Sequence, residues 1–290
     1  MAVRFEFYRF RFVLQALDAV TFPPGAAANT LRGAFGNLLR QSAANDAYTR
    51  FFEPTSLAGG PSGLRDQPRP FVFRCAHLDG SSIAPGEGFS FSMHVFELRR
   101  PVLPDIRAAF EGLRDVGIGL GRGRAELIRV EQLDLSDGCQ PLGAPPSVIS
   151  VDPDSDAPNV IRVRFVTPTE LKAVGTMAER PDFPVLFSRL RDRICTLQSL
   201  YGKDRWELDF RAMGERARQV QLTRSDLNWE YTVRRSSRTK RTHPLGGFTG
   251  DVEYQGDLGE FLPWLRAGRW VGVGRQTVWG KGEFRVSGGV

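Results

Sequence analysis

Hydrophobic positions follow two spacings along this chain, and the order of those spacings occurs twice. In the first half, alternation with a period of two predicts a strand over residues 3–15. The alternation slips near Phe7 and Tyr8, which we interpret as a β-bulge. The other elements expected in this half are a helix at 29–39, strands at 70–76 and 88–98, a helix at 101–115 and a strand at 124–134.

The second half shows the same succession of elements. Valine or isoleucine alternating with arginine predicts a strand over 159–167, and an apolar stripe with helical spacing predicts the helix after it. That stripe consists of Phe183, Leu186, Leu190, Ile194 and Leu197. The remaining elements expected are an additional helix or loop within 205–222, strands at 227–235 and 247–255, a short helix at 257–267 and a last strand.

A glycine pattern separates the last helix from the last strand in each half. The sequence V-G-I-G at 116–119 is followed by G-R-G at 121–123, and V-G-V-G at 271–274 is followed by G-K-G at 280–282. The two copies lie about one domain length apart. The segment 136–158 between them is rich in Ser, Asp, Gly and Pro, which is typical of a linker.

Each half therefore has the order β-α-β-β-α-β, which is the split βαβ arrangement. We predict an α+β fold made of two tandem ferredoxin-like (RRM-like) domains, each with a glycine-rich loop before its last strand. The domains are expected at 1–135 and 159–290, with a linker at 136–158.

The composition is that of a soluble globular protein, with 41% hydrophobic and 25% charged residues. No apolar run approaches the ~18 residues that a membrane-spanning helix needs. Arg4, Glu6, Arg9 and Arg11 interrupt the N-terminal segment, where a secretion signal has an apolar core. We expect a cytoplasmic protein without a membrane partner.

The net charge of +6 allows an acidic partner such as a nucleic acid. Nearly all of the 39 basic residues are arginines, because the only lysines are Lys172, Lys203, Lys240 and Lys281. A GC-rich genome alone would produce such a bias. The other explanation is that planar guanidinium groups suit the recognition of phosphates and bases.

The scarce residue types exclude several kinds of chemistry. Cys75, Cys139 and Cys195 are widely separated, so neither a zinc finger nor a disulfide framework is expected. The sequence contains no HExxH motif and no P-loop. The glycine-rich loops follow helices, whereas the dinucleotide-binding fingerprint follows a strand. We therefore expect no metal site and no nucleotide cofactor.

The segment 231–250 is strongly basic and contains no acidic residue. Its basic residues are Arg234, Arg235, Arg238, Lys240 and Arg241. The run is typical of a long hairpin loop between two strands. It could be merely a solvated loop, but unbalanced like charge repels itself unless a polyanion offsets it. We therefore interpret it as a phosphate-contacting loop.

The glycine-rich loops are candidate phosphate sites as well. Their backbone N–H groups can face a phosphate, and basic residues lie among the glycines. The alternative is that the glycines only make tight turns. For the first loop, with Arg122 and Arg124, the two interpretations stay equally open. For the second loop the basic segment before it favours binding of a phosphate backbone by Arg275, Lys281, Gly272, Gly274, Gly280 and Gly282.

Several motifs together resemble those of a known family. F-V-T-P-T at 165–169, followed by Leu171 and Lys172, is similar to the opening strand of the CRISPR-associated endoribonucleases that cut precursor CRISPR RNA within its repeats. L-Y-G at 200–202, the tryptophan at 229 and G-G-F-T-G at 246–250 resemble further signatures of that family. In the N-terminal half, L-R-G-A-F-G at 31–36 resembles a helix motif of the wider RAMP superfamily.

The resemblance implies metal-independent cleavage of CRISPR repeat RNA. The ribose 2′-OH attacks the adjacent phosphate and leaves a 2′,3′-cyclic phosphate and a 5′-OH. The implied partners are the precursor and mature crRNA, and other CRISPR effector subunits in addition. A different class of function has the same fold, namely a non-catalytic RNA-binding structural subunit of a CRISPR effector complex.

The resemblance also indicates where the catalytic residues would be. Many members of the family carry a histidine on the first helix, at the position that Arg32 occupies here. Arg32 could stabilise the phosphorane or only pack between the halves. His243 in the basic segment is the preferred acid or base, with a solvated loop histidine as the alternative. Tyr48 and Tyr231 could donate a proton or position the ribose, with buried packing in a strand as the commoner alternative for Tyr231.

The two remaining histidines are weaker candidates. His94 lies within a predicted strand, and His77 precedes the predicted turn L-D-G at 78–80. For both residues we expect a structural or solvated role.

Overall fold

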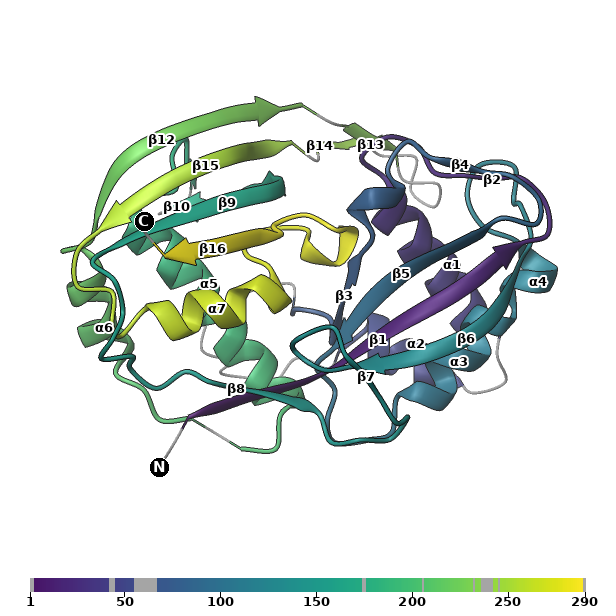
Figure 1. The fold of residues 1–290 in the computed structure, drawn as a ribbon, viewed down its shortest axis with the longest axis horizontal. Coiled ribbons are helices and arrows are strands. Elements are labelled where there is room, and N and C mark those ends of the chain that lie inside the picture. Colours follow the sequence, from purple (N-terminus) through teal and green to yellow (C-terminus); the bar gives the residue numbers. More distant parts are fainter. Residues whose placement is uncertain are drawn as a thin grey trace.

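The computed structural model describes residues 3–41, 45–54, 67–173, 176–204, 206–231, 233–235, 242–244 and 246–288. It consists of two antiparallel sheets, each covered by helices, that lie side by side (Figure 1). The N-terminal sheet has the order β3-β5-β1-β6-β7, and the C-terminal sheet has the order β12-β15-β9-β16.

The N-terminal sheet is built on the long strand β1. Its strands are β1 (Arg4–Ala16), β3 (Phe71–Arg74), β5 (Gly88–Val95), β6 (Ala125–Leu133), β7 (Cys139–Gln140) and β8 (Ser147–Ser150), which pairs with β1. The helices are α1 (Ala27–Gln41), α2 (Asn45–Phe52), α3 (Leu103–Glu111) and α4 (Leu113–Val116), with a 3₁₀ turn at Ala76–Leu78. A small hairpin joins β2 (Val20–Thr21) and β4 (Ser82–Ile83).

The C-terminal sheet repeats this plan. Its strands are β9 (Val160–Thr169), β12 (Gln221–Glu230), β15 (Gly247–Gln255) and β16 (Phe284–Gly288). Its helices are α5 (Phe183–Tyr201), α6 (Phe210–Ala217) and α7 (Leu262–Val271), followed by a 3₁₀ turn, η2 (Thr277–Trp279). Two short hairpins pair β10 (Lys172–Ala173) with β11 (Thr176–Met177), and β13 (Val233–Arg235) with β14 (Thr242–Pro244).

The strand order confirms the predicted fold class. In both sheets the third strand of the βαββαβ unit lies between the second and the first, and the fourth lies on the other side of the first. This is the ferredoxin-like order. The predicted linker 136–158 contains β7 and β8, and Val151 joins the C-terminal core. The exact division into domains stays a prediction.

The predicted bulge near Phe7 and Tyr8 is wrong. β1 pairs with β8 up to Phe7 and with β5 from Tyr8 onward, and the register shift of β1 against β6 lies between Val13 and Leu14. The alternation slips because β1 is buried on both faces. Phe5 and Phe7 pack into the C-terminal core, whereas Phe10, Phe12 and Leu14 pack into the N-terminal core.

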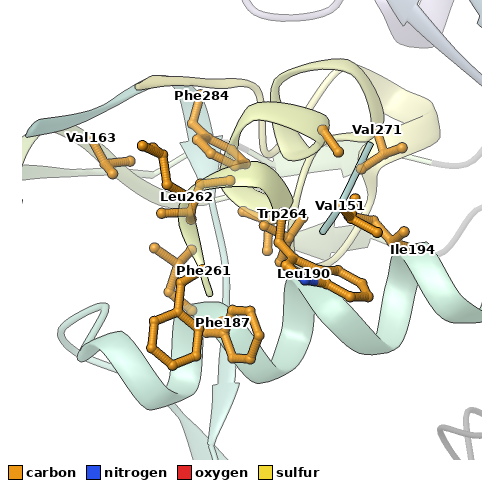
Figure 2. Packing of buried hydrophobic residues seen from close by; sticks show 14 of the residues in the cluster. Val151, Val163, Phe187, Leu190, Ile194, Phe261, Leu262, Trp264, Val271 and Phe284 are labelled. Carbon is orange, nitrogen blue, oxygen red and sulfur yellow. The ribbon is translucent and has the colours of Figure 1, made fainter. Parts of the chain in front are cut away.

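The C-terminal core lies between its sheet and the helices α5 and α7. Figure 2 shows Phe187, Leu190 and Ile194 of α5 facing Leu262 and Trp264 of α7, with Phe284 of β16 beside them. Gly268 allows the helices to approach, because a Cβ there would lie 2.8 Å from Leu190 Cδ2. The helix α7 is therefore held firmly, and it delivers the chain into the second glycine-rich loop.

No helix among the described residues is both long and apolar enough to cross a membrane.

Candidate functional site

The second glycine-rich loop, residues 272–282, crosses from α7 to β16 at the boundary between the two sheets. The Val273 N–H donates to the Gly282 carbonyl (2.9 Å), and the Gly282 N–H donates to the Pro168 carbonyl (3.1 Å). Gly280 lies so close to α1 that a Cβ there would be 2.5 Å from the Cβ of Ala28. A loop of the C-terminal half thus contacts the first helix of the N-terminal half.

Three largely buried side chains bind the C-terminal carbonyls of α7, and we call them the α7 clasp. Arg74 Nη2 donates to the Arg269 and Trp270 carbonyls (both 3.2 Å), and His94 Nδ1 donates to the Trp270 carbonyl (2.9 Å). From α5, Arg193 Nε donates to the Val271 carbonyl (3.1 Å). Donors and cations at a helix C-terminus satisfy its free carbonyls and its dipole. The clasp therefore fixes the point where the second glycine-rich loop begins.

His94 of the clasp is a neutral structural residue. It is buried against the Trp270 ring at 5.4 Å between centroids. Burial, followed by the nearby Arg74 charge, lowers its pKa well below the ordinary value. A neutral imidazole donates from Nδ1 to a carbonyl, as this one does. This burial agrees with the structural role that we expected for His94.

A basic cleft of about 450 Å³ opens beside the loop, between α1, α5 and the segment before β3. Among the described residues that line it, six are basic and one, Asp192, is acidic. The basic residues are Arg32, Arg69, Lys172, Arg189, Arg193 and Arg275. Such a concentration of one sign of charge attracts a polyanion.

A second hollow of about 290 Å³ lies on the other side of Trp279, which lines both. Its charged lining residues, among those described, are Lys281 and the carboxylates Asp79, Glu230 and Glu283. Lys281 is only 4% exposed, and burial lowers its pKa. The loop thus separates a basic cleft from a predominantly acidic hollow.

Comparison with family models gives one match in each half of the chain. Residues 163–284 match the family model described as CRISPR-associated endoribonuclease Cas6, and residues 5–151 match a family model described as an N-terminal domain. The C-terminal part of the chain, residues 163–284, is thus similar to Cas6 endoribonucleases. A search of curated proteins gave no match.

Solved Cas6 structures share this fold over nearly the whole chain. A Cas6 (TTHB231) product complex is 19% identical, covers 97% of this chain and 99% of its own, and has a TM-score of 0.62. Thermus thermophilus Cas6 (TTHB231) is 17% identical over 99% of this chain and 100% of its own, with a TM-score of 0.57. A chain of a partial Cas6-RT-Cas1–Cas2 complex is 11% identical, covers 98% of this chain and 46% of its own, and scores 0.63. These likenesses establish the fold.

The structure places two predicted catalytic residues against one ring. The Arg32 guanidinium of α1 lies over the Phe52 ring (5.1 Å) and the Trp279 ring (5.6 Å). Tyr48 of α2 stacks on Phe52 at 5.1 Å between centroids, and its hydroxyl accepts a hydrogen bond from Arg40. Arg32 therefore lines the basic cleft next to the second glycine-rich loop, with Tyr48 behind Phe52.

The other predicted catalytic residues belong to the hairpin region. Tyr231 follows β12 and is 89% exposed, with its ring 6.3 Å from that of Trp229. The backbone of His243 in β14 pairs with that of Arg234 in β13, and Arg235 pairs with Thr242. Arg238, Lys240 and Arg241 lie outside the described residues. The roles predicted for this segment stay predictions.

The glycine-rich loop residues divide between different surroundings. Arg275 lines the basic cleft, with Nη1 3.1 Å from Glu170 Oε2. Lys281 faces the acidic hollow instead. In the first loop, Arg122 is exposed, and Arg124 forms an exposed ion pair with Asp18 (2.7 Å). The structure brings Arg32 and Arg275 to one cleft, and it does not bring Lys281, Arg122 or Arg124 there.

Sequence reasoning missed four basic residues of the cleft, namely Arg69, Lys172, Arg189 and Arg193. Arg189 and Arg193 are one helical turn apart on α5, next to its apolar stripe. That spacing was available in the sequence, and it would have indicated a charged ridge at the edge of the buried face. Among the described residues, no group of three or more His, Cys, Asp or Glu side chains could hold a metal ion.

Proposed function

We propose that the protein is a metal-independent endoribonuclease that binds CRISPR repeat RNA and cuts the precursor transcript. One observation carries the proposal beyond the similarity to Cas6. The glycine-rich loop of the segment that matches Cas6 lies against α1 of the other half and borders a basic cleft. RNA phosphates bind where Lys and Arg side chains concentrate, since they displace condensed counterions.

The proposed reaction uses the RNA's own nucleophile. The 2′-oxygen attacks the adjacent phosphorus while a base removes the 2′-OH proton. The bond from phosphorus to the 5′-oxygen breaks, and an acid protonates the departing oxygen. The products are a 2′,3′-cyclic phosphate and a 5′-OH. Cations near the phosphorane stabilise its developing negative charge.

Arg32 has the best placement for stabilising the phosphorane. It lies in the cleft between two aromatic rings, which hold the guanidinium at a defined position. A group held in place before the reaction stabilises the transition state without the cost of ordering it. His243, Tyr231 and Tyr48 are the proposed acid and base candidates. Of these, Tyr231 presents the most exposed ring, and the Tyr48 hydroxyl is already bound by Arg40.

The proposed RNA contacts extend from the cleft to the hairpin. Arg275 and the loop glycines would face the phosphates near the cut. Arg234, Arg235, Arg238, Lys240 and Arg241 would bind phosphates farther along the RNA, as the charge of their segment indicates.

The test is cleavage of a repeat RNA in the presence of EDTA. A matched RNA carries a single 2′-deoxyribose at the cut position, identified first on the all-ribose substrate. We expect cleavage of the all-ribose RNA alone, with a cyclic phosphate detected on the upstream product by mass spectrometry. Binding of both RNAs without any cleavage would contradict the proposal and leave the structural subunit of an effector complex.

We also propose that the protein stays bound to the mature crRNA in the cytoplasm and meets other CRISPR proteins there. A related chain occurs in a complex named for Cas6, RT, Cas1 and Cas2, which supports assembly with CRISPR partners. Co-purification of the product RNA with the protein after cleavage would test the first part.

A further inference from the structure

Arg193 of α5 is a buried cation without a counter-ion among the described residues. It is 8% exposed, and its Nη2 is buried without a hydrogen-bond partner. Its Nε binds the Val271 carbonyl, which is neutral. The charged group that most affects it is Arg74, a second cation, and burial together with Arg74 lowers the pKa of Arg193 to about 9.

The nearby carboxylates are committed to other arginines. Asp192, the next residue along α5, forms an ion pair with Arg191 (2.9 Å) and a looser one with Arg189 (3.7 Å). Glu283 lies 3.8 Å from Arg74 Nε. Burying a charge without a partner is costly, and proteins retain such groups mainly where they have a use. A bound anion would remove this cost.

The surroundings of Arg193 are suited to a tetrahedral oxyanion. Arg193 lines the basic cleft, and so does Arg189, whose Nε is also buried without a hydrogen-bond partner. The turn at Gly274–Thr277 lines the same cleft and contains two residues with positive φ, Gly274 (+81°) and Gln276 (+63°). Backbones of this kind form concave N–H sites for anions.

We propose that Arg193 and Arg189, with the turn at Gly274–Thr277, form a phosphate-binding subsite on the wall of the basic cleft. The ligand is a phosphate group. We identify its source as the RNA backbone, and this identification rests on the proposed function. Free orthophosphate has the same chemistry and is the alternative source. Arg193 also binds α7 through Val271, so an occupied subsite would strengthen the clasp that positions the second glycine-rich loop.

The first experiment tests the subsite without RNA. Thermal unfolding is measured in chloride and in inorganic phosphate at matched ionic strength, for the wild type, Arg193→Gln and Arg189→Gln. The control is Arg211→Gln, because Arg211 is 90% exposed, lies outside the cleft and pairs with Glu215 on its own helix. We expect phosphate to raise the Tm of the wild type and the control by a few degrees, and to raise that of the two subsite variants less.

The chloride measurement separates a binding role from a structural one. Removing an uncompensated buried cation relieves its burial cost and so offsets the lost hydrogen bond to Val271, and the Tm of Arg193→Gln should equal or exceed that of the wild type. A purely structural arginine predicts a lower Tm. If Arg193→Gln does not fold, the assignment of Arg193 to the phosphate subsite is overturned. Arg189→Gln, which leaves the clasp intact, then decides whether a phosphate subsite exists at all.

The second experiment identifies the source of the phosphate. The affinity for an uncleavable repeat RNA, with 2′-deoxyribose at the cut position, is measured from low to high salt. An RNA phosphate at the subsite predicts that the slope of log K against log salt falls by about one for Arg193→Gln and not for Arg211→Gln. An unchanged slope together with a lost phosphate effect in the first experiment would assign the subsite to free phosphate. If the variants match the wild type both in the rise of Tm in phosphate and in the salt slope of RNA binding, the subsite is refuted, whether or not the RNA is cleaved.

Discussion

The two glycine-rich loops begin with the same backbone and end in different surroundings. Both helices stop at a glycine with nearly equal angles, φ 70° and ψ 175° at Gly117, and φ 72° and ψ 169° at Gly272. In each loop the next N–H donates to the last glycine's carbonyl at 2.9 Å, Ile118 to Gly123 and Val273 to Gly282. The repeated glycines therefore specify the same local turn.

The difference lies in what each turn contacts. The first loop pairs with strand β2 at Thr21 and exposes Leu120 by 75%. Figure 1 shows α4, which precedes it, at the end of the N-terminal sheet remote from the C-terminal sheet. The second loop contains the inserted turn η2, contacts α1, and lies between two hollows of opposite charge. A shared local motif thus closes a fold in one place and borders a candidate site in the other.

The largest expected difference concerns the backbone of the loops. At Gly282 (φ +73°) a Cβ would overlap the Val273 carbonyl oxygen, whereas at Gly121 (φ +85°) it would meet no atom within 4 Å. Gly282→Ala should lower the free energy of unfolding by more than ~3 kcal/mol, because strain and a backbone clash combine. Gly121→Ala should cost about 1–2 kcal/mol from positive φ alone. Chemical denaturation measures both, and equal losses would contradict the difference in packing.

The second difference concerns catalysis. Arg32→Ala should reduce cleavage of repeat RNA by roughly 100- to 1000-fold, the usual effect of losing one preorganised group that stabilises transition-state charge. Arg122→Ala, in the first loop, should leave the rate unchanged. Single-turnover cleavage at saturating enzyme compares the two. Equal rates in both variants would remove Arg32 from the proposed mechanism.

The third difference concerns pH, because the clasp contains a buried neutral histidine. The pKa of His94 is lower in the folded protein than in the unfolded chain, so the unfolded chain binds more protons below about pH 6.5. Stability from this group is complete above that pH and is lost as the pH falls, by at most ~1.4 kcal/mol per pH unit. His94→Gln should flatten the dependence of unfolding free energy between pH 6.5 and 5. His77→Gln, at an exposed position, is the control.

The smallest expected effect concerns single phosphate contacts. Arg275 borders the cleft, so Arg275→Gln should weaken RNA binding by about tenfold or less and reduce the salt slope by about one. Arg124, which follows the first glycine-rich loop, forms an ion pair with Asp18. Arg124→Gln should therefore change neither the RNA affinity nor the salt slope. Fluorescence anisotropy over a range of salt measures both. A stronger effect at Arg124 would place RNA on the first loop instead.

Local patterns were sufficient to predict most elements and the class of fold. The period of two in β9 and β15, the helical stripe of α5 and the glycine pairs after α4 and α7 all depend on neighbours within a few residues. The prediction of a bulge in β1 failed for the opposite reason. Phe5 and Phe7 are buried by a domain that is distant in sequence, and alternation alone does not distinguish a bulge from a strand buried on both faces.

The sequence by itself thus determined two βαββαβ units, their glycine turns and the family motifs, since hydrogen bonding and periodicity act over short distances. Only the tertiary structure decided that Arg74, His94 and Arg193 meet at the end of α7, and that Arg32, Arg189 and Arg275 line one cleft. The clasp contacts join positions up to 196 residues apart through the packing of two sheets. Charge balance is a property of neighbours in space, and for that reason the uncompensated Arg193 could be recognised only in the folded chain.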